Sequence, residues 1–295
     1  MAPAILTPLL AALLASVSAS LVQRRLTPAV GTRVLAIIIV GSALAVVWGA
    51  TILAVGFLVE VPWIASWAGW CRDLYRSDDA VSPAFGILGL AVLVTAVSGG
   101  GRVVRRHRSA TDWSTGAPLE VIPSDEPIAF AAPGRHGRIV VSTAMLDHLD
   151  RDERRVLFAH EQSHIDHRHD RYLLAAAVAS AGVPLLRPVA AQLRFSTERW
   201  ADEDAATVVG SRIVVARAIT RAALATVDHR YRSPALAGLG VRARVEALLA
   251  SDQPRPIAPA LGLTVAAGVV GANIAGSTMQ FHHLLAFAVH ICNLS

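Results

Sequence analysis

Two histidines and a glutamate stand in a spacing that suits metal-dependent hydrolysis. His160 and His164 are four positions apart, and Glu161 directly follows the first histidine. Positions i and i+4 share one face of a helix, so both imidazoles can bind the same zinc ion. Glu161 would then act as general base toward a zinc-bound water. We therefore predict Zn²⁺ as the cofactor and Glu161 as the catalytic residue; the opposing interpretation is an exposed polar helix face.

A catalytic zinc normally has three protein ligands and one position open to water. The run Glu198-Arg-Trp-Ala-Asp202 supplies a carboxylate on another predicted helix, and we predict Glu198 as the third ligand. His167 is the less favoured rival, because three ligands on one straight helix converge poorly on a single ion. Asp202 lies one turn after Glu198 and is predicted to accept a hydrogen bond from a ligand histidine; the alternative is an exposed carboxylate. His169 is expected at the surface or in a supporting role.

The elements predicted around these residues are a hairpin followed by helices. Residues 128–131 and 138–141 are short β-rich runs separated by proline and glycine, which predicts a β-hairpin. Asp150-Arg-Asp-Glu153 has the form of a capping box, and the helix that it opens is predicted to end near Tyr172.

Three further helices are expected, at 198–210, 212–228 and 242–250. Between them and the first helix lies an apolar stretch, 173–191, that is interrupted by glycine and proline. We predict an interfacial or re-entrant element for this stretch; the alternatives are a transmembrane hairpin and a part of the domain core.

Composition and long apolar runs indicate a membrane protein. Of the 295 residues, 54% are hydrophobic, and the mean hydropathy is +0.49. Four runs, at 4–22, 34–59, 80–101 and 257–276, meet the length of about 20 residues that a bilayer requires. We therefore predict a mostly α-helical membrane protein with about four transmembrane helices.

The placement of arginine predicts how the chain is oriented. Arginines are concentrated between the first two apolar runs and after the third, whereas the segment between the second and third has more acidic residues. Because positive residues mark cytoplasmic segments, the N-terminus is predicted outside a plasma membrane. The net charge of +5 and pI of about 10.2 often suggest nucleic-acid binding. Here the arginines flank apolar runs, so no direct nucleic-acid binding is expected.

Three segments follow from this topology. Residues 1–101 form a membrane domain with three spans, residues 102–255 form a cytoplasmic α+β zincin-like domain, and residues 256–295 hold the fourth span and a short tail. Cys71 and Cys292 would both lie outside, where a disulfide between them can persist. The alternative is two unpaired, buried cysteines.

Four motifs together resemble the BlaR/MecR-type membrane metallopeptidases. They are Glu126-Pro-Ile-Ala-Phe-Ala-Ala-Pro-Gly134, Arg138-Ile-Val-Val-Ser-Thr143, Ala159-His-Glu-Gln-Ser-His164 and Glu198-Arg-Trp-Ala-Asp202. The chain is also similar to the related HtpX and CAAX-prenyl endopeptidases. The resemblance implies that the two histidines and Glu198 bind zinc, and that Glu161 is catalytic.

This resemblance also implies a role and its rivals. The expected partners are the lipid bilayer and a protein or peptide substrate, such as a winged-helix repressor in regulatory proteolysis. Antibiotic sensors of the family carry a penicillin-binding domain with a Ser-x-x-Lys motif, and this sequence has no lysine, so direct β-lactam sensing is not expected. The alternatives are a quality-control protease for membrane proteins and a non-catalytic, zinc-binding membrane scaffold.

Overall fold

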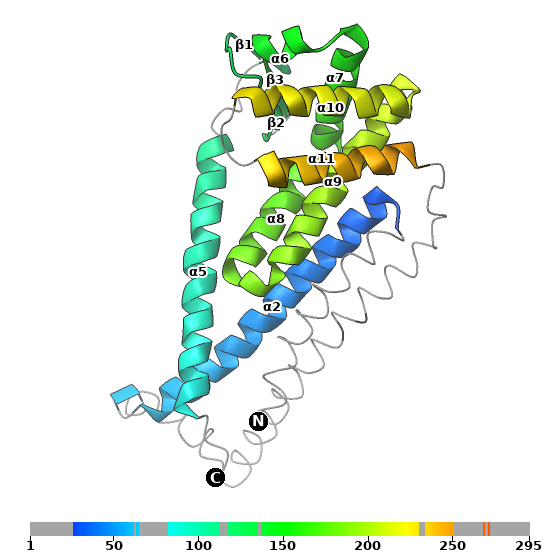
Figure 1. The fold of residues 1–295 in the computed structure, drawn as a ribbon. Helices are drawn as coiled ribbons and strands as arrows, with labels where there is room; N and C mark the ends of the chain where they lie inside the picture. Colours follow the sequence, from blue (N-terminus) through cyan, green and yellow to red (C-terminus); the bar gives the residue numbers. More distant parts are fainter. Residues whose placement is uncertain are drawn as a thin grey trace.

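The computed structural model of this chain is mostly helical, with a small three-stranded sheet at one end (Figure 1). It describes residues 26–61, 63–64, 82–111, 117–134, 137–229 and 234–250, together with 268 and 271. The first predicted span, all of the fourth except residues 268 and 271, Cys71 and Cys292 lie outside the described residues, so the predictions made for them stay predictions.

Two long helices, α2 (Pro28–Glu60) and α5 (Pro83–Thr111), correspond to the second and third predicted spans. Both are long and apolar enough to cross a membrane, with mean hydropathies of 2.3 and 1.8, which suggests a membrane protein. They pack closely because glycine lies at their contact: a Cβ on Gly89 would stand 2.7 Å from the carbonyl oxygen of Ala50. Glycine at such contacts lets helix backbones approach each other.

The apolar stretch 173–191 forms the turn of a helical hairpin. It comprises most of α8 (His169–Gly182), the 3₁₀ turn η1 (Pro184–Leu186) and the beginning of α9 (Arg187–Val209). Buried side chains of this hairpin, among them the fully buried Leu186, form one hydrophobic cluster with Leu35 and other residues of α2. The helix expected to begin after Thr197 therefore begins at Arg187, because tertiary burial extends it through an apolar segment with no capping signal.

The sheet has the order β1-β3-β2. Strands β2 (Ala129–Ala132) and β3 (Arg138–Ser142) pair in antiparallel register, which confirms the predicted hairpin. Strand β1 (Leu119–Ile122) pairs with β3 in parallel and was not predicted. Among the described residues no strand covers the outer edge of β2.

Helices α6 (Thr143–His148) and α7 (Arg151–Asp166) follow the sheet. The capping box at the start of α7 is present, since Asp150 accepts from the backbone of Glu153 and the Glu153 side chain accepts in return. The predicted end near Tyr172 is wrong. The helix ends at Asp166 because Arg168 takes a left-handed conformation, with φ of 53°, which no α-helix can accommodate.

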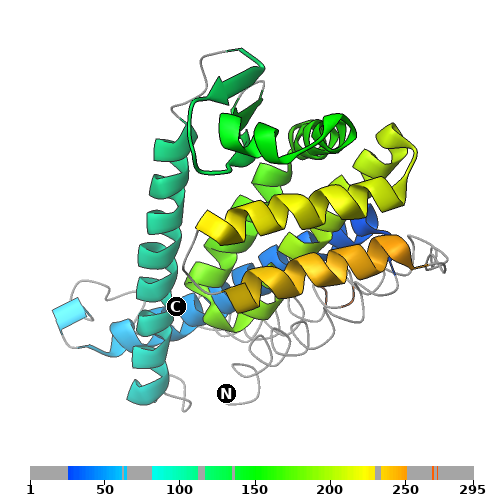
Figure 2. The same ribbon diagram turned by 45° about the horizontal axis from the view of Figure 1, so that its top comes forward.

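Helices α10 (Arg212–His229) and α11 (Pro234–Leu249), which end the described elements, lie over α7 and α9 as an antiparallel pair (Figure 2). The predicted helix at 242–250 therefore begins earlier, at Pro234, where proline suits the first turn of a helix. Glu153 anchors α10 on α7, because its fully buried carboxylate pairs with Arg217 at 3.2 Å and Arg221 at 2.9 Å.

Candidate metal centre

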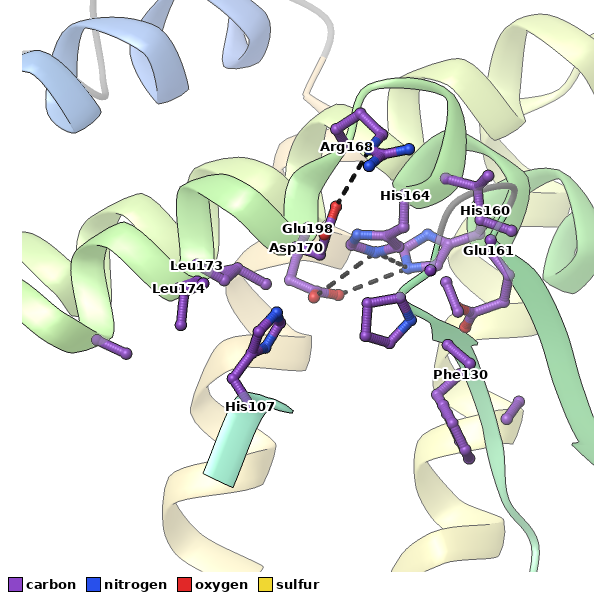
Figure 3. Close-up of a pocket in the computed structure, with 18 of the residues that line it drawn as sticks. His107, Phe130, His160, Glu161, His164, Arg168, Asp170, Leu173, Leu174 and Glu198 are labelled. Atoms are coloured by element: carbon purple, nitrogen blue, oxygen red, sulfur yellow. Dashed lines mark hydrogen bonds and ion pairs between the residues drawn. The ribbon is translucent and has the colours of Figure 1, made fainter. Parts of the chain in front are cut away.

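Three predicted ligands meet at one point between α7 and α9. The Nε2 atoms of His160 and His164 lie 3.2 Å apart. Glu198 of α9 places one carboxylate oxygen 3.5 Å from His160 Nε2 and the other 3.8 Å from His164 Nε2. All three donor atoms lie within 4.8 Å of one another (Figure 3). The structure thus brings together the three residues that the sequence analysis chose as ligands.

This donor set fits zinc. Two imidazole nitrogens bound at about 2.0–2.1 Å in tetrahedral geometry lie roughly 3.4 Å apart, close to the distance between the two histidines. Two histidines and a glutamate are a known ligand set of catalytic zinc sites, which leaves a fourth position for water. In the described part of the chain, the cluster includes no fourth donor.

Charge in the cluster also favours a cation. Burial by itself lowers the pKa of His160, but hydrogen bonds to Asp202 and Glu198 outweigh it and raise that pKa to about 10. Burial, aided by the charge on His160, lowers the pKa of His164 to about 4. Although burial opposes it, the hydrogen bond from His160 holds the pKa of Glu198 well below its usual range. The two ionised carboxylates therefore stabilise positive charge between them.

Asp202 lies where the sequence analysis expected it to act. Its Oδ1 atom is 3.0 Å from Nδ1 of His160, and the residue is only 1% exposed. Arg244 of α11 donates to both carboxylate oxygens, at 2.7 and 2.6 Å, and also contacts Glu198 at 3.0 Å. Asp202 is therefore buried and paired, and the exposed carboxylate of the alternative interpretation is wrong.

Arg244 was missed by the sequence analysis. It is one of two arginines in the segment Arg242-Ala-Arg244, and no spacing or neighbour marks it out. Arg242 is largely exposed and pairs within its own helix with Glu246, whereas Arg244 reaches the metal centre. What distinguishes the two arginines is the crossing of α11 over α9, which brings Arg244 and not Arg242 to the metal centre.

His169 occupies an unexpected place. It is fully buried, and its Nδ1 atom lies 2.9 Å from Nδ1 of His164. The expected surface position is therefore wrong, and a supporting position beside a ligand is what the structure shows. The left-handed Arg168 causes this, because it turns the chain so that the first residue of α8 points back at α7. Within the described residues, Nε2 of His169 has no hydrogen-bond partner.

His167, the rival ligand, points elsewhere. Its Nε2 atom is 2.9 Å from Asp204, which also accepts a hydrogen bond from Ser163 at 2.6 Å. The His167 ring stacks on Trp200 with centroids 4.3 Å apart. These contacts hold α7 against α9 and leave His167 outside the ligand cluster.

Glu161 lies beside the cluster without belonging to it. Its side chain is nearly buried and hydrogen-bonds the backbone of Ala131 on β2. Burial raises the pKa of Glu161, an effect that the charge on His160 partly offsets. A carboxylate with a raised pKa is better suited to take and return a proton near neutral pH.

A groove of about 510 Å³ opens at the metal centre. Strand β2 forms one wall, and Leu173 and Leu174 of α8 lie on the other side. His107 of α5 faces the groove near Glu198 (Figure 3). The groove therefore runs from the metal centre toward α5, one of the two helices that are long enough to cross a membrane.

Two imidazoles one helical turn apart, a carboxylate from a second helix and a buried glutamate beside them are the parts of a metallopeptidase centre. Residues 103–230 match the sequence model of peptidase family M48. This match supports an M48-family metallopeptidase and covers all three ligands, Glu161 and Asp202, but not Arg244. No curated protein and no solved structure matches the chain significantly.

Proposed function

We propose that this protein is a membrane zinc endopeptidase. The observation that carries the proposal is the convergence of His160, His164 and Glu198 beside a buried glutamate that is not itself a ligand. A structural zinc site would have a fourth protein ligand, and the cluster includes none among the described residues. The catalytic role is therefore better supported than that of a zinc-binding scaffold.

Each residue has a distinct task in peptide hydrolysis. The two histidines and Glu198 would hold the zinc, which when bound would polarise the scissile carbonyl and lower the pKa of water. Glu161 accepts the proton of the attacking water on its carboxylate and returns it to the leaving amine. Asp202 fixes His160 through Nδ1, so that Nε2 faces the metal position.

The exposed edge of β2 can hold an extended substrate by strand addition. Ser142 donates its N–H to Ile128 across the β2–β3 pair. Backbone bonding alternates along an antiparallel ladder, so Ala129 and Ala131 direct their backbone groups away from β3. Ala131 faces Glu161, which places this edge along the reacting groups.

The sequence patterns support a cellular setting that extends the proposal. We propose about four spans, a cytoplasmic peptidase domain and an outer N-terminus. The chain would then be a BlaR/MecR-type protease of regulatory proteolysis, with a winged-helix repressor as one substrate. Quality control of membrane proteins is the rival purpose.

Substitution of Glu161 tests the proposal directly. The full-length protein should contain about one zinc per chain, and Glu161→Gln should keep that zinc while losing activity by at least about 100-fold. His160→Ala serves as the control that loses metal. Cells carrying either wild-type or Glu161→Gln protein are compared by N-terminal proteomics, and peptides that vanish in the variant identify substrates.

The outcomes separate the alternatives. Cleaved repressors would support regulation, whereas many unrelated membrane proteins would support quality control. Full zinc occupancy without any Glu161-dependent cleavage, in cells or on peptides, would contradict the peptidase and leave the scaffold.

A further inference from the structure

A second cavity, of about 280 Å³, lies next to the metal centre. It and the groove share four lining residues: Ala129, His160, Glu161 and Glu198. The groove extends along the C-terminal half of α7, whereas the second cavity is lined by Val156 from its N-terminal half. The reacting groups therefore lie between two separate spaces, and a peptide held across them would place residues in both.

The walls of the second cavity are apolar. Leu149 after α6, together with Val156 and Leu157 of α7, forms one side, and Ile219 and Ala222 of α10 form the other. Leu149 and Val156 are almost fully buried. Further alanines of α10 line the cavity, and their small side chains leave the space between the helices open.

The polar side chains at the margins of this cavity already have partners. Glu153 pairs with Arg217 and Arg221, and Arg244 donates to Asp202. The hydroxyl of Thr226 donates to a backbone carbonyl of its own helix. A charged side chain that entered would lose its hydration without gaining a free partner, which is costly.

We propose that this cavity binds the side chain of a substrate residue next to the scissile bond, and that it selects an aliphatic side chain. This inference rests on the proposed endopeptidase function and deepens it. The cavity is somewhat smaller than the about 300–1,000 Å³ typical of pockets for whole small ligands, and it suits a single residue of the size of leucine, isoleucine or methionine. Ala222 limits that size from the α10 side.

Specificity is measured with a peptide library and zinc-loaded, full-length protein, with Glu161→Gln as the blank. One position next to the cleaved bond should be enriched in leucine, isoleucine or methionine and depleted in charged residues. Replacing that residue by alanine should lower kcat/KM by about 100-fold, since one methylene in an apolar pocket alters kcat/KM by about 10–200-fold.

Ala222→Phe should fill the cavity. The preferred residue should then become alanine or glycine, and kcat/KM for the leucine peptide should fall by about 100-fold, with zinc content unchanged. The control is Leu224→Phe on the same helix, at a side chain that is 59% exposed and does not line the cavity; it should keep the wild-type preference. If Ala222→Phe does not fold, Leu157→Ala tests the opposite wall of the cavity, on α7, and it should extend the preference to phenylalanine.

Two results would overturn the inference while leaving the peptidase intact. One is a wild-type preference for a charged residue at both positions that flank the cleaved bond. The other is an active Ala222→Phe or Leu157→Ala enzyme with unaltered preference. Zinc-loaded wild-type protein that cleaves no peptide beyond the blank would instead contradict the proposed function itself, and the inference with it.

Discussion

At the scale of the residue, the two histidines proposed as ligands differ in what orients them. His160 is held by the carboxylate of Asp202, 3.0 Å from its Nδ1 atom, whereas His164 meets the neutral ring of His169 at 2.9 Å. Burial, aided by the charge on His164, lowers the pKa of His169 to about 3, so this imidazole is neutral and can accept the Nδ1–H of His164. Such partners fix the tautomer and direction of a ligand.

His169→Phe should therefore weaken zinc binding by about 10–100-fold while retaining much of the ring's volume. Because the substitution leaves Nδ1 of His164 without this partner, the melting temperature of the metal-free protein should fall modestly. Zinc affinity is measured by competition with a chelator. His167→Phe is the matched control, since His167 bonds Asp204 and does not belong to the ligand cluster. Equal zinc affinities for the two variants would show that His169 does not position His164.

At the scale of the element, the edge strand β2 and helix α7 form one unit. Val141 of β3, which pairs with Ala129, is fully buried and anchors the sheet in the core. At the open edge of β2, the backbone of Ala131 hydrogen-bonds the side chain of Glu161. In the proposed peptidase, strand β2 would therefore align a peptide with Glu161.

Ala129→Pro tests this alignment. Proline removes the N–H that points to the open edge, and an edge strand tolerates proline where that group is not bonded within the sheet. We expect kcat/KM for peptides to fall by at least about tenfold, because one charge-free backbone hydrogen bond of about 0.5–1.5 kcal/mol is lost and the ring crowds the groove. Zinc content should stay unchanged. Ala129→Ser keeps the N–H and should retain activity; unchanged cleavage by the proline variant would argue against strand addition.

At the scale of the whole molecule, the groove and the apolar helices are parts of one packed structure. The middle of α5 packs on α8, and its later residues Val103 and His107 line the groove. The contact is close: a Cβ on Gly99 would lie 2.6 Å from the carbonyl oxygen of Ala181. The position of α5 therefore sets the width of the groove at its far end.

Gly99→Leu should force α5 away from α8. Overpacking of this kind costs about 1–3 kcal/mol, so the melting temperature of the full-length protein in detergent should fall, and peptidase activity should fall with it. Gly101→Leu is the matched control, because a Cβ there meets nothing within 4 Å in the described structure. If both variants melt alike, the close contact between α5 and α8 does not stabilise the protein.

The sequence by itself determined the local features of this protein. The spacing of His160 and His164, the capping box before α7 and the β-hairpin are read from neighbouring residues, because helices and hairpins form through contacts short in sequence. The apolar run of α2 is likewise evident from composition, since the length required to cross a bilayer is fixed. Glu198 and Asp202 were proposed from their spacing on one helix.

Only the tertiary structure decided which distant residues meet. Arg244 resembles Arg242 in sequence, and the crossing of α11 over α9 gives it buried carboxylate partners. His169 was expected near the surface or in support, and the left-handed Arg168 turned it against His164. The second cavity exists because alanines of α10 face α7 across a gap. Such placements depend on packing between elements far apart in the chain, and local patterns do not encode which faces of two helices will touch.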